Sequence, residues 1–110
     1  MKIAIPMAEG RLTNHFGHCQ YFSIIKTTNE LIEGKEEITP PPHEPGLLPR
    51  WLHEMGVDMV IAGGMGARAI NLFNERGIKV IIGAPNETPE VLVKAYIEGK
   101  LTTGANACDH

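Results

Sequence analysis

The densest group of metal-binding side chains is the segment His15-Phe16-Gly17-His18-Cys19, which holds two imidazoles and one thiol. Imidazole nitrogen and thiolate sulfur together suit zinc, copper and iron. The segment is not the helical His-Glu-x-x-His motif, and the chain has no paired Cys-x-x-Cys motif to complete a closed structural zinc site. It predicts metal ligation by His15, His18 and Cys19. The alternative is that Phe16 anchors the loop in the core, Gly17 supplies a turn, and the histidines are ordinary surface residues.

Three further donors, His43, Cys108 and His110, lie elsewhere in the chain. The last two belong to a polar tail, residues 100–110, that follows the last predicted helix. Eleven extended residues span on the order of 35 Å, enough for the tail to return to the other donors. Chain ends are usually disordered unless contacts hold them, so the tail is either a cover for the site or a free end.

A glycine-rich turn is the second candidate binding element. Residues 64–69, Gly-Met-Gly-Ala-Arg-Ala, match the Gly-x-Gly-x-x-Ala fingerprint of dinucleotide binding. The acidic residue that should reach the ribose is missing, because the next predicted strand ends in Gly83-Ala84-Pro85. What remains is a helix N-terminus with exposed amides and Arg68 beside it, which suits an anion. The alternative is that the glycines only permit a tight turn and close packing.

Hydrophobic periodicity and turn residues divide the chain into eight elements. In chain order they are strands at 2–6 (ended by Pro6), 21–26 and 31–38, a helix from Leu47 that Gly56 stops, a strand at 58–62, a helix at 67–76, a strand at 78–82, and a helix from Pro89 to about Glu98. A proline-rich connector, residues 39–46, separates the first three strands from the first helix. The order β-β-β-α-β-α-β-α predicts a single α/β domain, residues 1–110, with a mixed five-stranded sheet and helices on both faces.

This topology places the candidate metal ligands and the glycine-rich turn at one edge of the sheet. The loops after the first, third, fourth and fifth strands emerge at one edge of the sheet, where open α/β proteins bind ligands. These loops carry His15, His18 and Cys19, then His43, then the turn 63–66, and then residues 83–86. We therefore expect the imidazoles, the thiol and the glycine turn to converge.

Composition excludes several functions. Ten Lys and Arg against thirteen Asp and Glu give a net charge of −3, without the basic stripe that nucleic-acid binding needs. No apolar run approaches the ~18 residues of a membrane span, and no signal peptide is apparent, so we expect a cytoplasmic protein, either a monomer or a homodimer. The only serine, Ser23, lies in a predicted strand, and no nucleophile, base and orienting group occur together. We predict that the protein is not an enzyme.

The segments Lys2-Ile3-Ala4-Ile5-Pro6, residues 14–22 and residues 63–69, with the closing helix, resemble the dinitrogenase iron-molybdenum cofactor biosynthesis family. This family includes the NifX-like proteins and the C-terminal domain of NifB. The resemblance covers nearly the whole chain and implies a ribonuclease H-like fold without catalytic activity. It further implies that the cargo is a metal-sulfur cluster or precursor containing iron, molybdenum or both, and that donor and recipient proteins of cofactor assembly are the partners.

Carried over by position, the resemblance places His15, His18 and Cys19 at the cluster pocket. It makes Gly64, Met65, Gly66, Ala67 and Arg68 the wall that faces the anionic cluster. Two cysteines cannot supply four thiolates, so a cluster would need His ligands, a second subunit or largely noncovalent binding. Two other functions stay open: a mononuclear zinc or copper site, and a module that binds a small anion or nucleotide.

Overall fold

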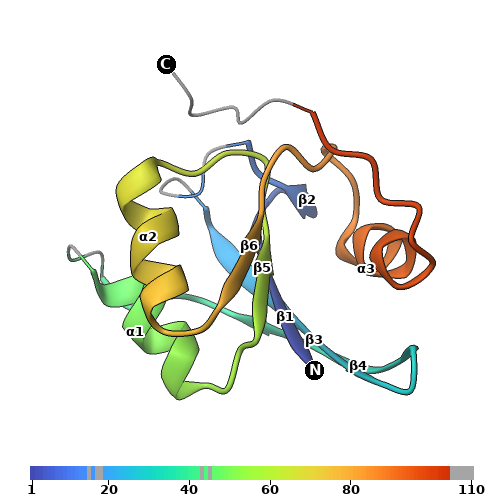
Figure 1. The fold of residues 1–110 in the computed structure, drawn as a ribbon, viewed down its shortest axis with the longest axis horizontal. Helices are drawn as coiled ribbons and strands as arrows, with labels where there is room; N and C mark the ends of the chain where they lie inside the picture. The colour runs from blue at the N-terminus through green and yellow to red at the C-terminus, as the bar shows by residue number, and fades with distance from the viewer. Residues whose placement is uncertain (15, 17–18, 43, 45, 105–110) are drawn as a thin grey trace.

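The computed structural model describes residues 1–104 except residues 15, 17, 18, 43 and 45. Figure 1 shows a twisted sheet with helices on both of its faces. In chain order the elements are β1 (Lys2–Ala8), β2 (Arg11–Leu12), β3 (Tyr21–Thr28), β4 (Leu31–Ile38), α1 (Leu47–Glu54), β5 (Met59–Ile61), α2 (Ala67–Glu75), β6 (Lys79–Ile81) and α3 (Pro89–Ile97).

The described strands form one mixed sheet of six strands. Its main path runs β4-β3-β1-β5-β6, and the short strand β2 pairs with β1 beside this path. β1 is antiparallel to β3 and parallel to β5, and β5 is parallel to β6. The predicted mixed α/β sheet is confirmed, but the predicted count of five strands is wrong by one. Arg11 and Leu12 form the additional strand, and two residues are too few to show the alternation by which strands are recognised.

β1 continues past Pro6, so the prediction that this proline ends the first strand is wrong. Met1 and Thr27 exchange two backbone hydrogen bonds of 2.8 Å, which sets the hydrogen-bonded positions along β1 and β3. Pro6 falls on the alternate set, where an N–H group would point away from β3. On that other side β5 pairs with β1 at Ile3 and Ala4, before Pro6 is reached. The proline ring therefore removes no hydrogen bond to β3 or β5. On the side away from β3, the Pro6 carbonyl still accepts from the Thr13 amide at 3.0 Å.

Two hydrophobic cores lie on opposite faces of the sheet. Side chains alternate along β1, so that Ala4 belongs to one core while Ile3 and Ile5 belong to the other. The helices complete these cores with buried side chains: Leu48, Leu52 and Phe73 from α1 and α2 in the first, and Leu92 and Val93 from α3 in the second. The two layers of helices pack against the strands and so position the strand ends from which the loops leave.

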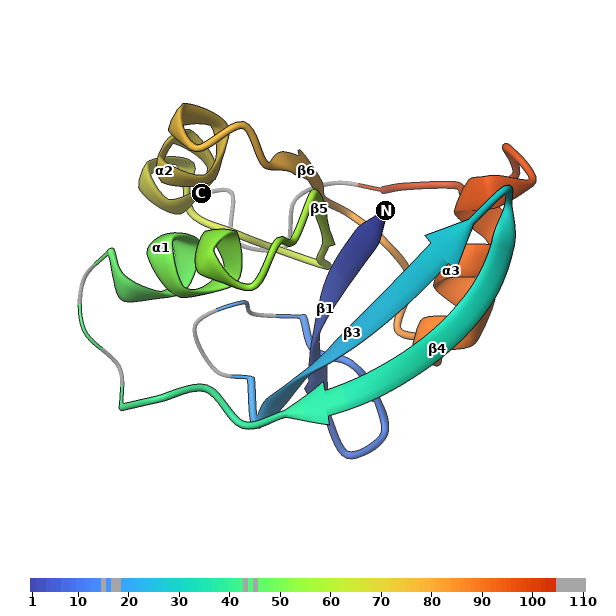
Figure 2. The same cartoon turned by 90° about the horizontal axis from the view of Figure 1, so that it is seen from below.

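The element boundaries agree closely with those expected. The three helices begin at the predicted residues and end at Glu54, Glu75 and Ile97. β5 and β6 are shorter than predicted, since only three residues of each are paired. β4 forms one outer edge of the sheet and is almost wholly exposed (Figure 2). No helix in the described ranges is both long enough and apolar enough to cross a membrane.

Candidate functional site

Four segments that are distant in sequence meet where β1, β5 and β6 end, which we call the carboxyl edge. The Gly104 amide donates to the Gly83 carbonyl at 2.7 Å, and the Gly83 amide donates to the Gly63 carbonyl at 2.9 Å. On the other side of the glycine turn, the Phe16 amide donates to the Gly64 carbonyl at 3.1 Å. We call this chain of contacts, from Gly104 through Gly83, Gly63 and Gly64 to Phe16, the glycine ladder. It confirms that the loops after β2, β5 and β6 converge (Figure 1).

Glycine is required at two of these positions because backbones approach closely. A Cβ atom on Gly63 would lie 3.2 Å from the Asn14 Cα and 3.3 Å from the Thr13 carbonyl oxygen. Gly83 has a φ of 77°, and a Cβ atom there would overlap the backbone of Gly104, at 2.7 Å from its carbonyl carbon. Side chains at either position would push the converging segments apart.

Phe16 packs against the helical core from the segment between β2 and β3. Its side chain is 6% exposed, and its ring meets Phe22 and Phe73 edge-on with centroids 5.8 and 5.5 Å apart. Edge-to-face aromatic pairs add to the free energy gained by burying their area. The expectation that Phe16 can anchor this segment is confirmed, and its amide lies beside the glycine turn.

Cys19 is the one predicted metal ligand that lies within the described residues. It is partly buried against the helical core and is a free thiol. Burial is the larger influence on this thiol and a hydrogen bond with its own backbone opposes it, so the pKa is raised from 9.0 to about 11. The thiol is therefore protonated at pH 7, and a metal that binds its sulfur must displace the proton.

The glycine turn leads into an uncapped helix N-terminus. Gly66 is the N-cap of α2, where no side chain caps the helix and no acidic residue lies in the first turn. Gly66, Ala67 and Arg68 are exposed, so the first amides of α2 and the guanidinium group are accessible to an anion. Gly64 and Met65 are buried, and the Met65 side chain packs in the helical core. Backbone amides and Arg68 are thus the accessible polar groups of this wall.

The remaining predicted ligands, His15, His18, His43, Cys108 and His110, lie outside the described residues. Within the described ranges, no three His, Cys, Asp or Glu side chains come close enough to hold a metal ion. The structure thus places Phe16, in the segment that carries Cys19, beside the glycine turn. The complete ligand set stays a prediction.

Of two surface hollows, one adjoins the carboxyl edge and the other lies at the opposite end of β1. A hollow of about 430 Å³ adjoins the carboxyl edge and is lined by residues 8–9, residues 11–14 and Asn86. The Asn86 side-chain amide donates to the Leu12 carbonyl, and the Leu12 amide donates to the Glu87 carbonyl at 3.0 Å. These bonds fasten β2 to the loop after β6.

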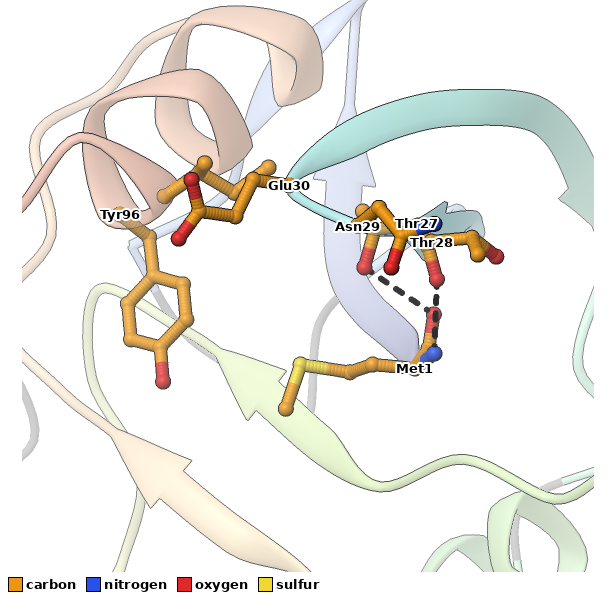
Figure 3. Close-up of a pocket in the computed structure, with 7 residues that line it drawn as sticks. Met1, Thr27, Thr28, Asn29, Glu30 and Tyr96 are labelled. Carbon is orange, nitrogen blue, oxygen red and sulfur yellow. Dashed lines mark hydrogen bonds between the residues drawn. The ribbon is translucent and has the colours of Figure 1, made fainter.

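A larger hollow, of about 630 Å³, lies at the opposite end of β1 (Figure 3). Its lining consists of Met1, residues 27–30, Tyr96 and Ile97. It contains no imidazole or thiol, so it does not offer the ligands that the sequence predicts for a metal.

Sequence reasoning missed the contact between Gly83 and Gly104. The only signal was the presence of glycine at both positions, since nothing in a single sequence shows that two distant backbones touch. The sequence left the tail as either a cover for the site or a free end, and its described part reaches the carboxyl edge at Gly104.

Comparisons with known proteins place the chain among relatives of similar length. The model of a family described as dinitrogenase iron-molybdenum cofactor matches residues 1–99. An uncharacterized protein of Methanocaldococcus jannaschii, MJ0580, is 35% identical over 106 residues, which cover 92% of this chain and 89% of that protein.

Solved structures show the same fold. The crystal structure of PH0822 superposes with a TM-score of 0.91 at 31% identity and covers 100% of both chains. The apo form of the orange protein from Desulfovibrio gigas has a TM-score of 0.74 at 20% identity, covering 96% of this chain and 93% of that one.

Proposed function

The chain belongs to the dinitrogenase iron-molybdenum cofactor family, and we propose that it is a non-catalytic carrier of a metal-sulfur cluster. The cargo would be an iron-molybdenum cofactor or a precursor of it. The observation that carries the proposal is the hydrogen bond from the Phe16 amide to the Gly64 carbonyl. It joins the loop that bears imidazole and thiol donors to the turn that bears an anion-facing helix N-terminus.

The two sides of this site have complementary chemistry. His15, His18 and Cys19 would coordinate metal atoms of the cargo, with His43, Cys108 and His110 as further donors. The amides that follow Gly66 and the guanidinium of Arg68 would face its sulfide surface. A sulfide-rich cluster is anionic, and a chain of net charge −3 attracts it only through such local groups.

The Cys19 thiol makes loading dependent on pH. Because burial raises its pKa to about 11, metal ligation at neutral pH releases a proton. The metal affinity contributed by this ligand is therefore expected to rise about tenfold for each unit by which the pH increases, up to that pKa. A carrier benefits from this property, because a metal that competes with a proton for the Cys19 sulfur is held weakly at neutral pH and can pass to a stronger ligand.

A role without catalysis is supported by the described residues. The only serine, Ser23, is fully buried in β3, and its hydroxyl has no hydrogen-bond partner among the described groups. The Cys19 thiol is neutral at pH 7 and thus a poor nucleophile. We propose donor and recipient proteins of cofactor assembly as the partners, and a cytoplasmic location, which suits a free thiol.

The proposed fold type is ribonuclease H-like, as the family resemblance implies. Support comes from the main path β4-β3-β1-β5-β6, in which only β3 runs against its neighbours.

Anaerobic reconstitution tests the carrier function. The metal-free protein is incubated with ferrous iron and sulfide, with and without molybdate, and is then desalted and analysed for metal, sulfide and visible absorption. We expect a coloured complex whose formation is lost in a variant with His15→Ala, His18→Ala and Cys19→Ala. His53→Ala is the matched control, because His53 is an exposed histidine on α1 that is not among the predicted ligands. Equal loading of the triple variant and the wild type would overturn the proposal.

A mononuclear zinc or copper site is the second candidate. It is favoured by the donor count, since two cysteines are too few for the four thiolates of an iron-sulfur cluster. Zinc titration separates the two functions, because bound zinc is colourless. Stoichiometric zinc binding together with failure to retain iron and sulfide would favour the mononuclear site.

A further inference from the structure

The described part of the tail is held at both of its ends. After α3, the Lys100 amide donates to the Ala95 carbonyl at 2.8 Å, and Leu101 packs against the core beneath α3. At the far end, the Gly104 amide donates to Gly83. Residues 101–104 therefore cross from the end of α3 to the carboxyl edge as a strap (Figure 1).

Gly83 connects this strap to the glycine turn. Its carbonyl accepts the bond from Gly104, and its amide donates the bond to Gly63. The next residue of the turn, Gly64, accepts from Phe16. One residue thus touches both the strap and the turn, and the turn touches the loop that carries Cys19.

We propose that the strap positions Phe16 through the glycine ladder and thereby raises the affinity of the segment that carries Cys19 for metal cargo. The inference deepens the proposed carrier function and rests on it for the choice of cargo. Gly104 and Gly83 are positioning residues: neither needs to touch the cargo. Loss of the bond from Gly104 leaves Gly83 held only through Gly63 and thereby loosens the turn to which the Phe16 amide is bonded.

The size of the effect follows from one backbone hydrogen bond. The net contribution of such a bond corresponds to about a three- to tenfold change in an equilibrium. The apparent affinity of a site is proportional to the fraction of time that the site spends in its binding form. Contacts that raise this fraction before binding therefore increase the affinity. We expect a change of about three- to tenfold in affinity when the bond from Gly104 is removed.

Gly104 offers a matched pair of substitutions. Gly104→Pro removes the N–H that Gly83 accepts. Gly104→Ala keeps the N–H, and its new Cβ atom would lie 3.9 Å from the Gly83 carbonyl oxygen, an ordinary contact. The two variants differ in the hydrogen bond and both leave Cys108 and His110 in place.

Amide hydrogen exchange without cargo tests the positioning directly. We expect Gly104→Pro to speed exchange of the Gly83 and Phe16 amides about three- to tenfold, while Gly104→Ala leaves both rates unchanged. The amides of Ile3 and Ile25, which pair in β1 and β3, report global opening, so faster exchange there without faster exchange at Phe16 would show a general loss of stability and would also overturn the inference. Equal exchange at Phe16 in the proline variant and the wild type would overturn the inference.

Anaerobic loading with ferrous iron and sulfide is the second measurement. Gly104→Pro should raise the dissociation constant three- to tenfold relative to Gly104→Ala, and equal affinity would overturn the inference. If the wild type retains no iron and sulfide, the carrier function fails, and the exchange rates alone then decide whether the strap positions Phe16.

Discussion

The amide of Phe16 lies 3.1 Å from the carbonyl oxygen of Gly64, although the two residues are far apart in the chain. This bond joins Phe16, in the segment between β2 and β3, to the glycine turn that precedes α2. The Phe16 ring is buried against Phe22 and Phe73 and so anchors the residue that donates this bond. The arrangement predicts how substitutions around the carboxyl edge affect stability and cargo binding.

Phe16→Ala should lower the free energy of unfolding by about 3–5 kcal/mol, the usual cost of deleting a buried aromatic ring. The cavity would also release the loop, so metal loading should fall with stability. Urea unfolding followed by Trp51 fluorescence measures the change, because Trp51 packs against Phe22 with centroids 5.8 Å apart. Leu31→Ala is the control, since that side chain is 68% exposed, and a similar loss there would contradict the account.

Gly63→Ala should destabilise the protein by about 1–3 kcal/mol because the new methyl group has no space. Its nearest neighbours would include the Asn14 Cα and the Thr13 carbonyl, both backbone atoms that cannot turn away. Gly34→Ala in β4 meets nothing within 4 Å and provides the comparison. Thermal unfolding of the two variants measures the difference, and equal melting temperatures would show that the close approach at Gly63 is absent.

The Cys19 thiol should make the protein less stable at alkaline pH. Because its pKa is raised to about 11 in the folded state from 9.0, the unfolded chain loses this proton first as the pH rises. The stabilising contribution is therefore complete below pH 9 and is lost as the pH rises through 11. Cys19→Ala should remove this part of the decline when unfolding is measured from pH 8 to pH 11. Parallel stability curves for the variant and the wild type would contradict the assigned burial.

Arg68→Ala should weaken the binding of an anionic iron-sulfide cluster about two- to fivefold, a modest effect because the guanidinium is exposed. Binding of zinc, a cation, should not weaken. Arg76→Ala is the matched control, since Arg76 is the C-cap at the opposite end of the same helix. The difference between the two variants should shrink as salt is added. An equal loss in both variants would indicate general charge rather than a local contact.

The order of the major elements could be predicted because each carries a clear local pattern. Alternation in β1 and continuous apolar runs in β5 and β6 identify strands, and glycines mark the helix ends. β2 was missed because Arg11 and Leu12 have no period of their own. Pro6 was misread because the register that spares its missing N–H depends on pairing with distant strands.

The site was predictable only in part, for a similar reason. Topology alone brings the loops after parallel strands to one edge, and Phe16 is recognisable as an apolar anchor among polar residues. The bonds between Gly104, Gly83 and Gly63 connect backbones across the fold, and no residue pattern encodes them. The ionisation of Cys19 likewise depends on how deeply the loop packs, which follows from tertiary contacts.

The most direct measurement of the central claim is the metal and acid-labile sulfide content of the protein purified without oxygen from its own host. A cluster carrier is predicted to contain iron or molybdenum together with sulfide, in amounts that fall when His15, His18 and Cys19 are all replaced by alanine. Protein that holds zinc or copper without sulfide, or whose iron and sulfide do not depend on these three residues, would contradict the account.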